Sequence, residues 1–239
     1  MKGLTAVITG ASGGIGRAIC YRLAKEGVNL VMFGGTNTEK LRKTAAEIEG
    51  KANGIRVEYY PCDLTNEENV KSVFPQAAKN GVDILINNAG LAYSAPIEKT
   101  GMEIFDKIMK VNFRAPVLLI KEALPFLKNS KCASIINIAS VVAHSGYPLQ
   151  SAYTASKHAL LGFTKSIAAE LYSQDIRVHA VSPGGVYTDM IKISRPDLTE
   201  EGMIMPDDVA EAVVFLLKNR TNAVIDEISM HRAAKQPFL

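Results

Sequence analysis

Tyr153 and Lys157 are two residues whose types and spacing could do chemistry. They are four positions apart, so on a helix their side chains would share one face. A phenol has a reference pKa of about 10, which is too high for a base at neutral pH, but a nearby ammonium group favours the phenolate. Because general acid–base catalysis is most efficient when the pKa lies near the working pH, such a pair could serve it. Taken alone, the pair is more typical of an exposed helix surface.

Ser140 favours the catalytic interpretation, because it directly follows an apolar strand candidate at 134–139. Ligands of parallel α/β sheets bind beyond the carboxyl ends of the strands. A hydroxyl at that place could hydrogen-bond a substrate carbonyl and stabilise the charge that develops on its oxygen. We therefore expect Ser140 and Tyr153 to act on one substrate.

A glycine-rich turn offers a binding site for a phosphate group. Directly after the first strand candidate the chain reads Thr9-Gly10-Ala11-Ser12-Gly13-Gly14-Ile15-Gly16 and then enters a helix candidate. Glycines let the backbone turn tightly and approach a pyrophosphate, while the helix N-terminus supplies free N–H groups. Glycines also serve ordinary tight turns, but their place between a strand and a helix favours the binding interpretation.

The elements that must position these residues alternate along the chain. Short, apolar and partly β-branched runs predict strands at 5–9, 29–33, 56–61, 83–87, 134–139, 177–182 and 225–230. Helical patterns between them cover 15–26, 39–49, 66–78, 101–127, 152–173 and 207–218. This alternation predicts an α/β fold, with a doubly wound parallel sheet of about seven strands and helices on both faces.

Local signals mark some of the helix ends. Thr65-x-x-Glu68 and Thr100-x-x-Glu103 have the form of capping boxes, and Pro206 suits a first helical turn. Pro116 instead lies inside the helix candidate 101–127, where it deletes the hydrogen bond from residue 116 to the carbonyl of Asn112. Such a carbonyl could hold a water, or the proline could simply be a tolerated kink.

The bulk composition excludes several classes of protein. The chain has 239 residues and a net charge of +3, and its basic residues are dispersed, so nucleic acid is not implied as a partner. No apolar run is long enough to span a bilayer, and a strand candidate starts at Thr5, so we expect a cytoplasmic protein without a membrane partner. Cys20, Cys62 and Cys132 lack metal-ligand spacing, which predicts buried reduced thiols and no metal site.

Five motifs in register support a resemblance to a known family. The glycine turn has the spacing TGxxxGxG, and Asp63, Asn87-Asn88-Ala89-Gly90, Tyr153-x-x-x-Lys157 and Pro183-Gly184 with Thr188 follow in order. In these motifs the sequence resembles the classical short-chain dehydrogenases/reductases from residue 9 to residue 188. The resemblance implies an NAD(P)-dependent oxidoreductase that interconverts a ketone and a secondary alcohol. It also implies a single Rossmann-fold catalytic domain over residues 1–239.

The resemblance also assigns roles to the catalytic residues, which would be Asn112, Ser140, Tyr153 and Lys157. Tyr153 would be the acid/base, Ser140 would orient the substrate, and Lys157 would bind the ribose and tune the tyrosine. In related enzymes the main chain at the Asn112 position holds a water that passes protons from solvent. Whether Pro116 helps to make that water site or is a tolerated kink stays open.

Most of the cofactor residues implied by the resemblance lie at the strand ends, and Tyr153 and Lys157 lie on the helix candidate 152–173. The full set is Gly10, Ser12, Gly13, Ile15, Gly34, Thr36, Asp63, Leu64, Asn88, Ala89, Gly90, Tyr153, Lys157, Pro183, Gly184, Val186 and Thr188. NADP(H) is favoured over NAD(H), because no carboxylate follows the second strand before Glu39 to bind a ribose 2′-hydroxyl. The arginine of many NADP-using relatives is also missing near Gly35. Neutral donors or cations could replace it, namely Thr36, Asn37, Thr38, Arg17, Lys40 and Arg42.

The substrate side is less specific. In relatives the pocket is lined by the segments that match 91–96, 141–147 with Gln150, and 189–205. Here their residues suggest a mainly apolar cavity, with Ser140, Val142, His144, Gln150 and Tyr153 as substrate-binding residues. His144 could equally be an exposed loop histidine. The favoured substrate is a small hydrophobic ketone or alcohol.

Two other functions and the assembly remain open. The alternative reaction is that of a 3-oxoacyl-(acyl-carrier-protein) reductase, although Ser173-Gln174-Asp175 lacks the basic residue often seen there. A non-catalytic dinucleotide-binding redox sensor would be expected to have lost the Tyr, Lys or Ser that this chain keeps. A homo-oligomer, dimer or tetramer, is implied, although the end of the chain lacks the usual glycine-rich finish. His179 stands where relatives often have Asn, and no catalytic role is expected of it.

Overall fold

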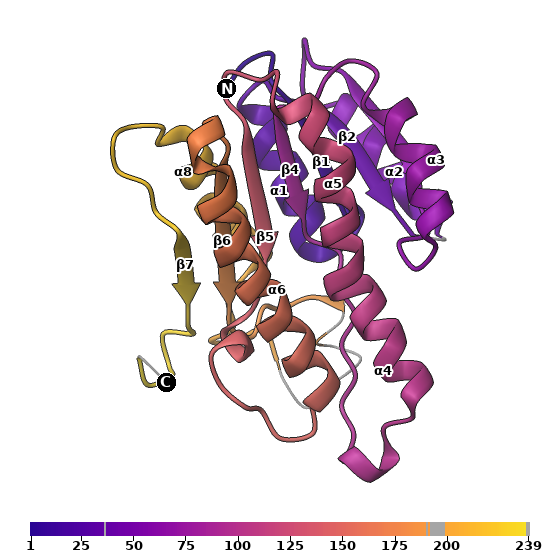
Figure 1. Cartoon of the computed structure of the whole chain (residues 1–239), viewed down its shortest axis with the longest axis vertical. Coiled ribbons are helices and arrows are strands. Elements are labelled where there is room, and N and C mark those ends of the chain that lie inside the picture. Colours follow the sequence, from indigo (N-terminus) through magenta and orange to yellow (C-terminus); the bar gives the residue numbers. More distant parts are fainter. Residues whose placement is uncertain (36, 190, 192–198, 238–239) are drawn as a thin grey trace.

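The computed structural model describes residues 1–35, 37–189, 191 and 199–237 (Figure 1). Over this part of the chain seven strands form one parallel sheet in the order β3-β2-β1-β4-β5-β6-β7. The strands are β1 (Thr5–Thr9), β2 (Asn29–Gly34), β3 (Val57–Pro61), β4 (Ile84–Asn87), β5 (Ser134–Ile138), β6 (Arg177–Pro183) and β7 (Glu227–Met230). The predicted doubly wound parallel sheet is therefore confirmed.

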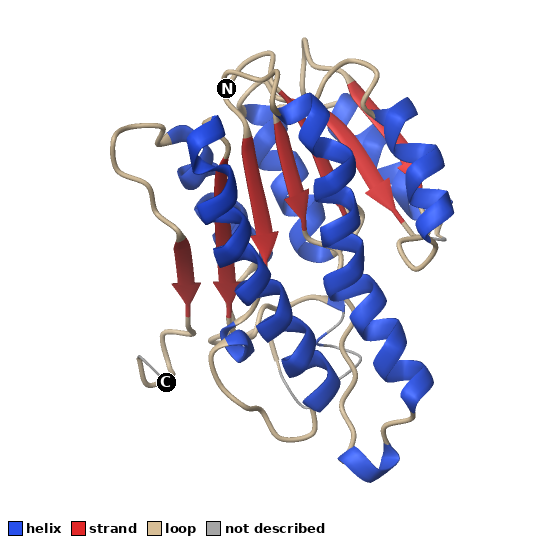
Figure 2. Ribbon diagram, viewed as in Figure 1, coloured by secondary structure: helices blue, strands red, loops and turns tan. Residues whose placement is uncertain are grey.

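Helices cover both faces of this sheet (Figure 2). They are α1 (Gly14–Lys25), α2 (Thr38–Glu49), α3 (Glu67–Ala77), α4 (Met102–Met109), α5 (Ala115–Leu127), α6 (Ser151–Leu171) and α8 (Pro206–Lys218). Short 3₁₀ turns occur at η1 (Ile97–Lys99), η3 (Val141–Ala143) and η4 (Tyr172–Gln174).

The apolar strands separate two layers of core. In β1 the side chains of Ala6 and Ile8 pack with α1, α2 and α8, whereas Val7 packs with α3, α5 and α6. Successive residues of a strand point to opposite faces, so a strand covered on both faces must be apolar almost throughout. Because all pairings are parallel, every strand presents its carboxyl end at the same edge of the sheet. The order reverses beside β1, which predicts a ligand crevice at that edge.

Two predicted helix caps are wrong. The cap of α3 is Asn66, whose side chain accepts from the N–H of Asn69 at 3.1 Å, while the Thr65 hydroxyl donates to Asp63 at 2.7 Å. Asn is at least as good a cap as Thr, and here it stands one residue closer to the helix. Similarly, the Thr100 hydroxyl donates to the carbonyl of Pro96 at 3.1 Å, so it closes η1 instead of capping α4. Pro206 does begin α8, as predicted.

The predicted helix 101–127 is interrupted by one wide turn. Residues Lys110–Arg114 form a π-helical turn between α4 and α5, and the N–H of Ala115 bonds to the carbonyl of Lys110, five residues back. Pro116 is buried and comes directly after this turn, at the start of α5. The proline therefore stands where the chain returns from the π to the α register, and π turns are frequent at functional sites.

The cysteines follow the prediction only in part. Cys20 and Cys62 are buried, Cys132 is half-buried, and all three are free. Burial raises the pKa of the Cys62 thiol to about 11, so this thiol is protonated at neutral pH.

Candidate active site at the carboxyl edge of the sheet

The glycine turn after β1 packs directly against the turn after β4. Gly10 has a φ of +63°, and a Cβ there would lie 2.9 Å from Nδ2 of Asn88. A Cβ on Gly16 would collide with the carbonyl oxygen of Gly10. Only glycine satisfies these two positions, because one needs the left-handed region and the other leaves no room for a side chain. The spacing of the turn is thus fixed by its fit against β4.

Thr9 and Asn88 lock the two turns together. The Thr9 hydroxyl accepts hydrogen bonds from the N–H groups of Asn88 and Ala89, each at 3.0 Å, and the Asn88 side chain donates to the carbonyl of Thr9 at 2.9 Å. These hydrogen bonds fix the turn that leads into α1. The N–H groups at the N-terminus of α1 then suit a pyrophosphate.

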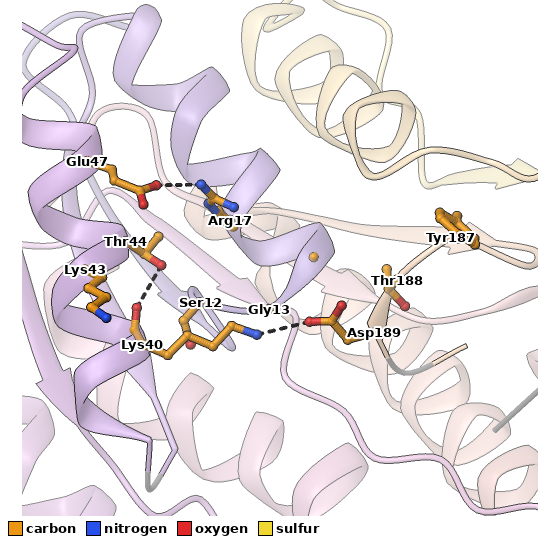
Figure 3. A pocket seen from close by; sticks show the side chains of 11 residues that line it. Ser12, Gly13, Arg17, Lys40, Lys43, Thr44, Glu47, Tyr187, Thr188 and Asp189 are labelled. Carbon is orange, nitrogen blue, oxygen red and sulfur yellow. Dashed lines mark hydrogen bonds and ion pairs between the residues drawn. The ribbon is translucent and has the colours of Figure 1, made fainter. Parts of the chain in front are cut away.

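A cavity of about 310 Å³ opens beside this turn (Figure 3). Its lining residues come from the glycine turn, α1, α2 and the segment after β6, and they are Ser12, Gly13, Gly14, Arg17, Lys40, Lys43, Thr44, Glu47, Tyr187, Thr188 and Asp189. Lys40 reaches towards the segment after β6 and pairs with Asp189 at 3.1 Å (Figure 3). The Arg17 guanidinium pairs with Glu47 at 2.5 Å. The cavity thus combines helix N-termini with lysine and arginine side chains, a donor set that suits an anionic ligand.

The predicted cofactor residues within the described chain all lie at this edge. They follow β1 (Gly10, Ser12, Gly13 and Ile15), close β2 (Gly34), follow β3 (Asp63 and Leu64) and β4 (Asn88, Ala89 and Gly90), and extend from the last residue of β6 (Pro183, Gly184, Val186 and Thr188). Thr36 lies outside the described residues. Hydrogen bonds from Thr65 hold the pKa of the Asp63 carboxyl below its usual range, so this group is ionised at neutral pH.

Lys157 and Tyr153 project from α6 towards the end of β5. Lys157 is buried, and its Nζ donates to the carbonyl of Ile138 at 2.7 Å and lies 5.7 Å from the centre of the Tyr153 ring. Burial lowers the pKa of Lys157 to about 8. The pKa of Tyr153 is raised by burial and lowered less strongly by a hydrogen bond with Ser140. The ammonium neighbour alone therefore does not give the low phenol pKa that the sequence suggested, because burial dominates.

Ser140 connects this pair to β6. Its hydroxyl is buried, donates to the carbonyl of Pro183 at 3.3 Å and accepts from the N–H of Val142 at 3.4 Å. Ser140 is also the N-cap of η3, in an extended conformation. The structure thus brings Ser140, Tyr153 and Lys157 together at the ends of β5 and β6, as predicted.

Asn112 is the fully buried centre of a second network. Its side chain accepts from the N–H of Leu91 at 2.7 Å and donates to the carbonyl of Leu91 at 2.8 Å and to the hydroxyl of Ser156 at 3.0 Å. Ser156 in turn donates to the carbonyl of Tyr153 at 2.7 Å. Asn112 therefore fixes the segment after β4 against α6. Ser156 was not singled out in the sequence, although it directly precedes Lys157 on the same helix.

The predicted pocket segment 91–96 touches the chain at Leu149 and Gln150. The Gln150 side chain donates to Ser94 at 3.3 Å, and the N–H of Ala95 bonds to the carbonyl of Leu149 at 2.8 Å. The predicted substrate residue Gln150 therefore lies against this segment. Val142 is buried, and its N–H donates to the Ser140 hydroxyl. The predicted segment 189–205 lies partly outside the described residues.

His144 has a different partner from the other substrate candidates. Its side chain is 39% exposed, and Nε2 lies 2.7 Å from Oε1 of Glu227 in β7. Glu227 was not singled out in the sequence, where it is one of two adjacent acidic residues in the strand candidate 225–230. His179 is buried in β6, where Nδ1 lies 2.7 Å from the carbonyl of Ile225, and burial lowers its pKa.

Comparison with known proteins decides the family. A family model described as short chain dehydrogenase matches residues 4–199. The chain belongs to the short chain dehydrogenase family. It is therefore an NAD(P)-dependent oxidoreductase that acts on CH–OH groups and interconverts a ketone and a secondary alcohol. The resemblance inferred from the five motifs is confirmed.

Named short-chain dehydrogenases resemble this chain over most of its length. A 3-oxoacyl-(acyl-carrier-protein) reductase of Rickettsia bellii (strain RML369-C) is 37% identical over 232 residues, which cover 94% of this chain and 93% of that protein. A D-beta-hydroxybutyrate dehydrogenase of Rhizobium meliloti (strain 1021) is 36% identical over 213 residues, covering 88% and 82%. The solved structure of an alcohol dehydrogenase from Thermococcus sibiricus, complexed with 5-hydroxy-NADP, has a TM-score of 0.88 at 29% identity and covers 98% of both chains.

Within the residues that the structure describes, no group of three or more His, Cys, Asp or Glu side chains is arranged to hold a metal ion. None of the helices there combines the length and the apolar character that crossing a bilayer requires.

Proposed function

We propose that Tyr153 is the acid/base of the reaction and that the substrate is a mainly hydrophobic ketone or secondary alcohol. The observation that carries this proposal is the meeting of Ser140, Tyr153 and buried Lys157 at the ends of β5 and β6, on the same edge of the sheet as the glycine turn. We propose, in addition, that residues 1–239 form a single catalytic domain.

Each of these side chains has one task in ketone reduction. A bound nicotinamide dinucleotide supplies the hydride to the carbonyl carbon. The Tyr153 hydroxyl gives its proton to the carbonyl oxygen. The Ser140 hydroxyl turns from the carbonyl of Pro183 and donates its hydrogen bond to the same substrate oxygen. Below its pKa of about 8 the Lys157 ammonium is charged and stabilises the tyrosinate that remains. The reverse reaction uses the same groups in the opposite order.

Asn112 is the remaining member of the proposed catalytic set. Its side chain is committed to Leu91 and Ser156, so only its main chain is offered for the water that passes protons from solvent to Lys157. The π turn at Lys110–Arg114 changes the hydrogen-bond register around this residue, which supports a role for its carbonyl outside the helix.

The dinucleotide is proposed to be NADP(H), held by the residues at the ends of β1 to β4 and β6 and by Tyr153 and Lys157. Lys40 is the cation of the cavity best placed for a 2′-phosphate, because it lies in the first turn of α2, the helix that follows β2. It pairs with Asp189 at 3.1 Å, and a phosphate would compete for the ammonium group. The ratio of the catalytic efficiencies with NADPH and NADH decides the preference. A higher efficiency with NADH would contradict it.

Substrate contacts are proposed for Ser140, Val142, His144, Gln150 and Tyr153. The names of the relatives favour 3-oxo compounds and their alcohols, so a panel should include ethyl acetoacetate, 3-hydroxybutyrate, cyclohexanone, aliphatic ketones and a steroid ketone. Turnover of these compounds is followed by the absorbance of NADPH and NADH. We expect hydrophobic ketones to be reduced faster than charged ones. Failure of the whole panel, despite tight dinucleotide binding, would favour a non-catalytic redox sensor.

Reduction of 3-oxoacyl groups on a carrier protein is the second candidate reaction. The relative from Rickettsia bellii carries that name. Comparing a 3-oxoacyl thioester on a carrier protein with the same thioester on a small thiol tests it, because carrier specificity requires a much lower KM for the protein-bound form. A cytoplasmic location and a dimer or tetramer are also proposed, and light scattering of the purified protein measures the assembly.

A further inference from the structure

Glu227 joins three segments beside the proposed catalytic residues. Its carboxylate oxygen Oε1 lies 2.7 Å from Nε2 of His144 and accepts a hydrogen bond from the hydroxyl of Ser182. The Glu227 side chain is only 21% exposed, and Ser182 is fully buried. One carboxylate oxygen therefore links β7, β6 and the segment that follows β5.

Both partners of Glu227 adjoin Ser140. His144 ends the single turn that Ser140 begins, in which the N–H of Ala143 bonds to the carbonyl of Ser140 at 2.9 Å. Ser182 directly precedes Pro183, whose carbonyl accepts the hydrogen bond of the Ser140 hydroxyl. Glu227 thus holds the turn that carries Ser140 and also the strand end to which the Ser140 hydroxyl is bonded.

The geometry is that of a support and not of a second nucleophile. In a nucleophile triad the imidazole contacts the serine hydroxyl, whereas here the carboxylate contacts both the hydroxyl and the imidazole. Ser182 is also shielded from solvent. Hydrogen bonds to a carboxylate are stronger than those between neutral groups, and a buried hydroxyl left without its acceptor is costly. The contacts of Glu227 can therefore hold backbone segments in place.

We propose that Glu227 is a positioning residue for Ser140. It acts through His144 and Ser182, and it fixes the two backbone segments that set the direction of the Ser140 hydroxyl. The inference rests on the proposed role of Ser140 at the substrate oxygen. Since Glu227 lies at the β7 side of the sheet, it leaves the glycine turn and the cavity beside α2 unaffected.

The test compares variants of Glu227 in the full chain, with ethyl acetoacetate and NADPH as the probe reaction. We expect Glu227→Ala to lower kcat about tenfold, because one or two charge-assisted hydrogen bonds are lost. The dissociation constant for NADPH, measured by fluorescence titration, should not change. Glu227→Gln should lower kcat less than Glu227→Ala does, since its amide oxygen can still accept from Ser182 but the charge is lost. The matched control is Glu211→Ala, which removes an exposed carboxylate paired with Arg22 at 2.7 Å.

A double-variant cycle separates positioning from a general loss of stability. His144→Ala and Glu227→Gln should each lower kcat, and the double variant should lower it by less than the product of the two effects. Unchanged kcat in Glu227→Ala, or multiplying effects in the cycle, would overturn the proposal. Where Glu227→Ala does not fold, the cycle decides alone, because both of its single variants are milder. Ser140→Ala distinguishes the two failures: if it keeps full turnover, the proposed function itself is wrong.

Discussion

The two halves of the carboxyl edge are built in different ways. The half that follows β1 to β4 depends on the backbone: glycines without room for a Cβ, main-chain hydrogen bonds to Thr9, and the N-terminus of α1. The half that follows β5 to β7 depends on side chains that meet across long stretches of sequence, such as His144 with Glu227, 83 residues apart. The first design suits a ligand shared by a whole family, and the second can be changed residue by residue to suit a substrate.

The largest effect should come from removing the acid/base while leaving the backbone half intact. We expect Tyr153→Phe to lower turnover of a ketone by about 10²–10⁴-fold, the usual contribution of a positioned proton donor. NADPH affinity, measured by fluorescence, should change far less, because the glycine turn and the cavity are untouched. His158→Ala is the control, since this exposed residue lies on the same helix. Full turnover in Tyr153→Phe would refute the assignment.

The next effect concerns Lys157, whose burial has a cost that depends on pH. Its pKa is lowered from 10.5 to about 8, so on lowering the pH the unfolded chain takes up the proton before the folded chain does. This lysine should therefore make the cofactor-free protein less stable as the pH falls from about 10.5 to 8, by about 3 kcal/mol, with no further change below pH 8.

Chemical denaturation of wild type and Lys157→Met at pH 7 and at pH 10.5 measures this cost. The variant should gain stability relative to wild type at pH 7, and the difference should shrink at pH 10.5. Lys165→Met on the exposed face of α6 is the matched control and should show no such trend. A difference that does not depend on pH would show that burial does not perturb this lysine.

A smaller effect is expected in the backbone half, where Lys40 supplies a side-chain charge. Lys40→Ala should weaken NADPH binding about tenfold, the value of one hydrogen bond to a charged group, and leave NADH binding nearly unchanged. Isothermal calorimetry with both cofactors measures the two affinities. Lys51→Ala serves as the control, because Lys51 packs on the Tyr21 ring and does not line the cavity. An equal loss of affinity for both cofactors would contradict the proposed contact between Lys40 and the 2′-phosphate.

The smallest effect should come from Pro116, which follows the π turn that contains Asn112. Pro116→Ala restores an N–H that can bond to the carbonyl of Asn112 in an α register. We expect a modest fall in turnover together with a shifted pH profile. If both stay unchanged, the proline is only tolerated after the π turn and has no part in holding a water.

The comparison also explains which parts could be predicted from the sequence. The glycine turn was predictable because Gly10 and Gly16 are each required by local backbone geometry. The sheet was predictable because strands buried on both faces must be apolar. The π turn was not, because its register depends on the contacts of Asn112 with Leu91, 21 residues away.

Side-chain partners were the least predictable part of the site. The caps at Thr65 and Thr100 were wrong because each hydroxyl found a nearer acceptor, Asp63 and the carbonyl of Pro96. The partner of His144 could not be predicted, since only the pairing of β7 with β6 brings Glu227 close. The burial that raises the pKa of Tyr153 was not predictable either, because it depends on how α6 packs.

The measurement that tests the central claim most directly is a crystal structure with NADP⁺ and a ketone that is an inhibitor or a slow substrate. The account predicts that the carbonyl oxygen lies within hydrogen-bond distance, about 2.6–3.2 Å, of both Tyr153 Oη and Ser140 Oγ. The dinucleotide should lie on the glycine turn after β1. A carbonyl oxygen bound by other side chains, with Tyr153 out of reach, would contradict the account.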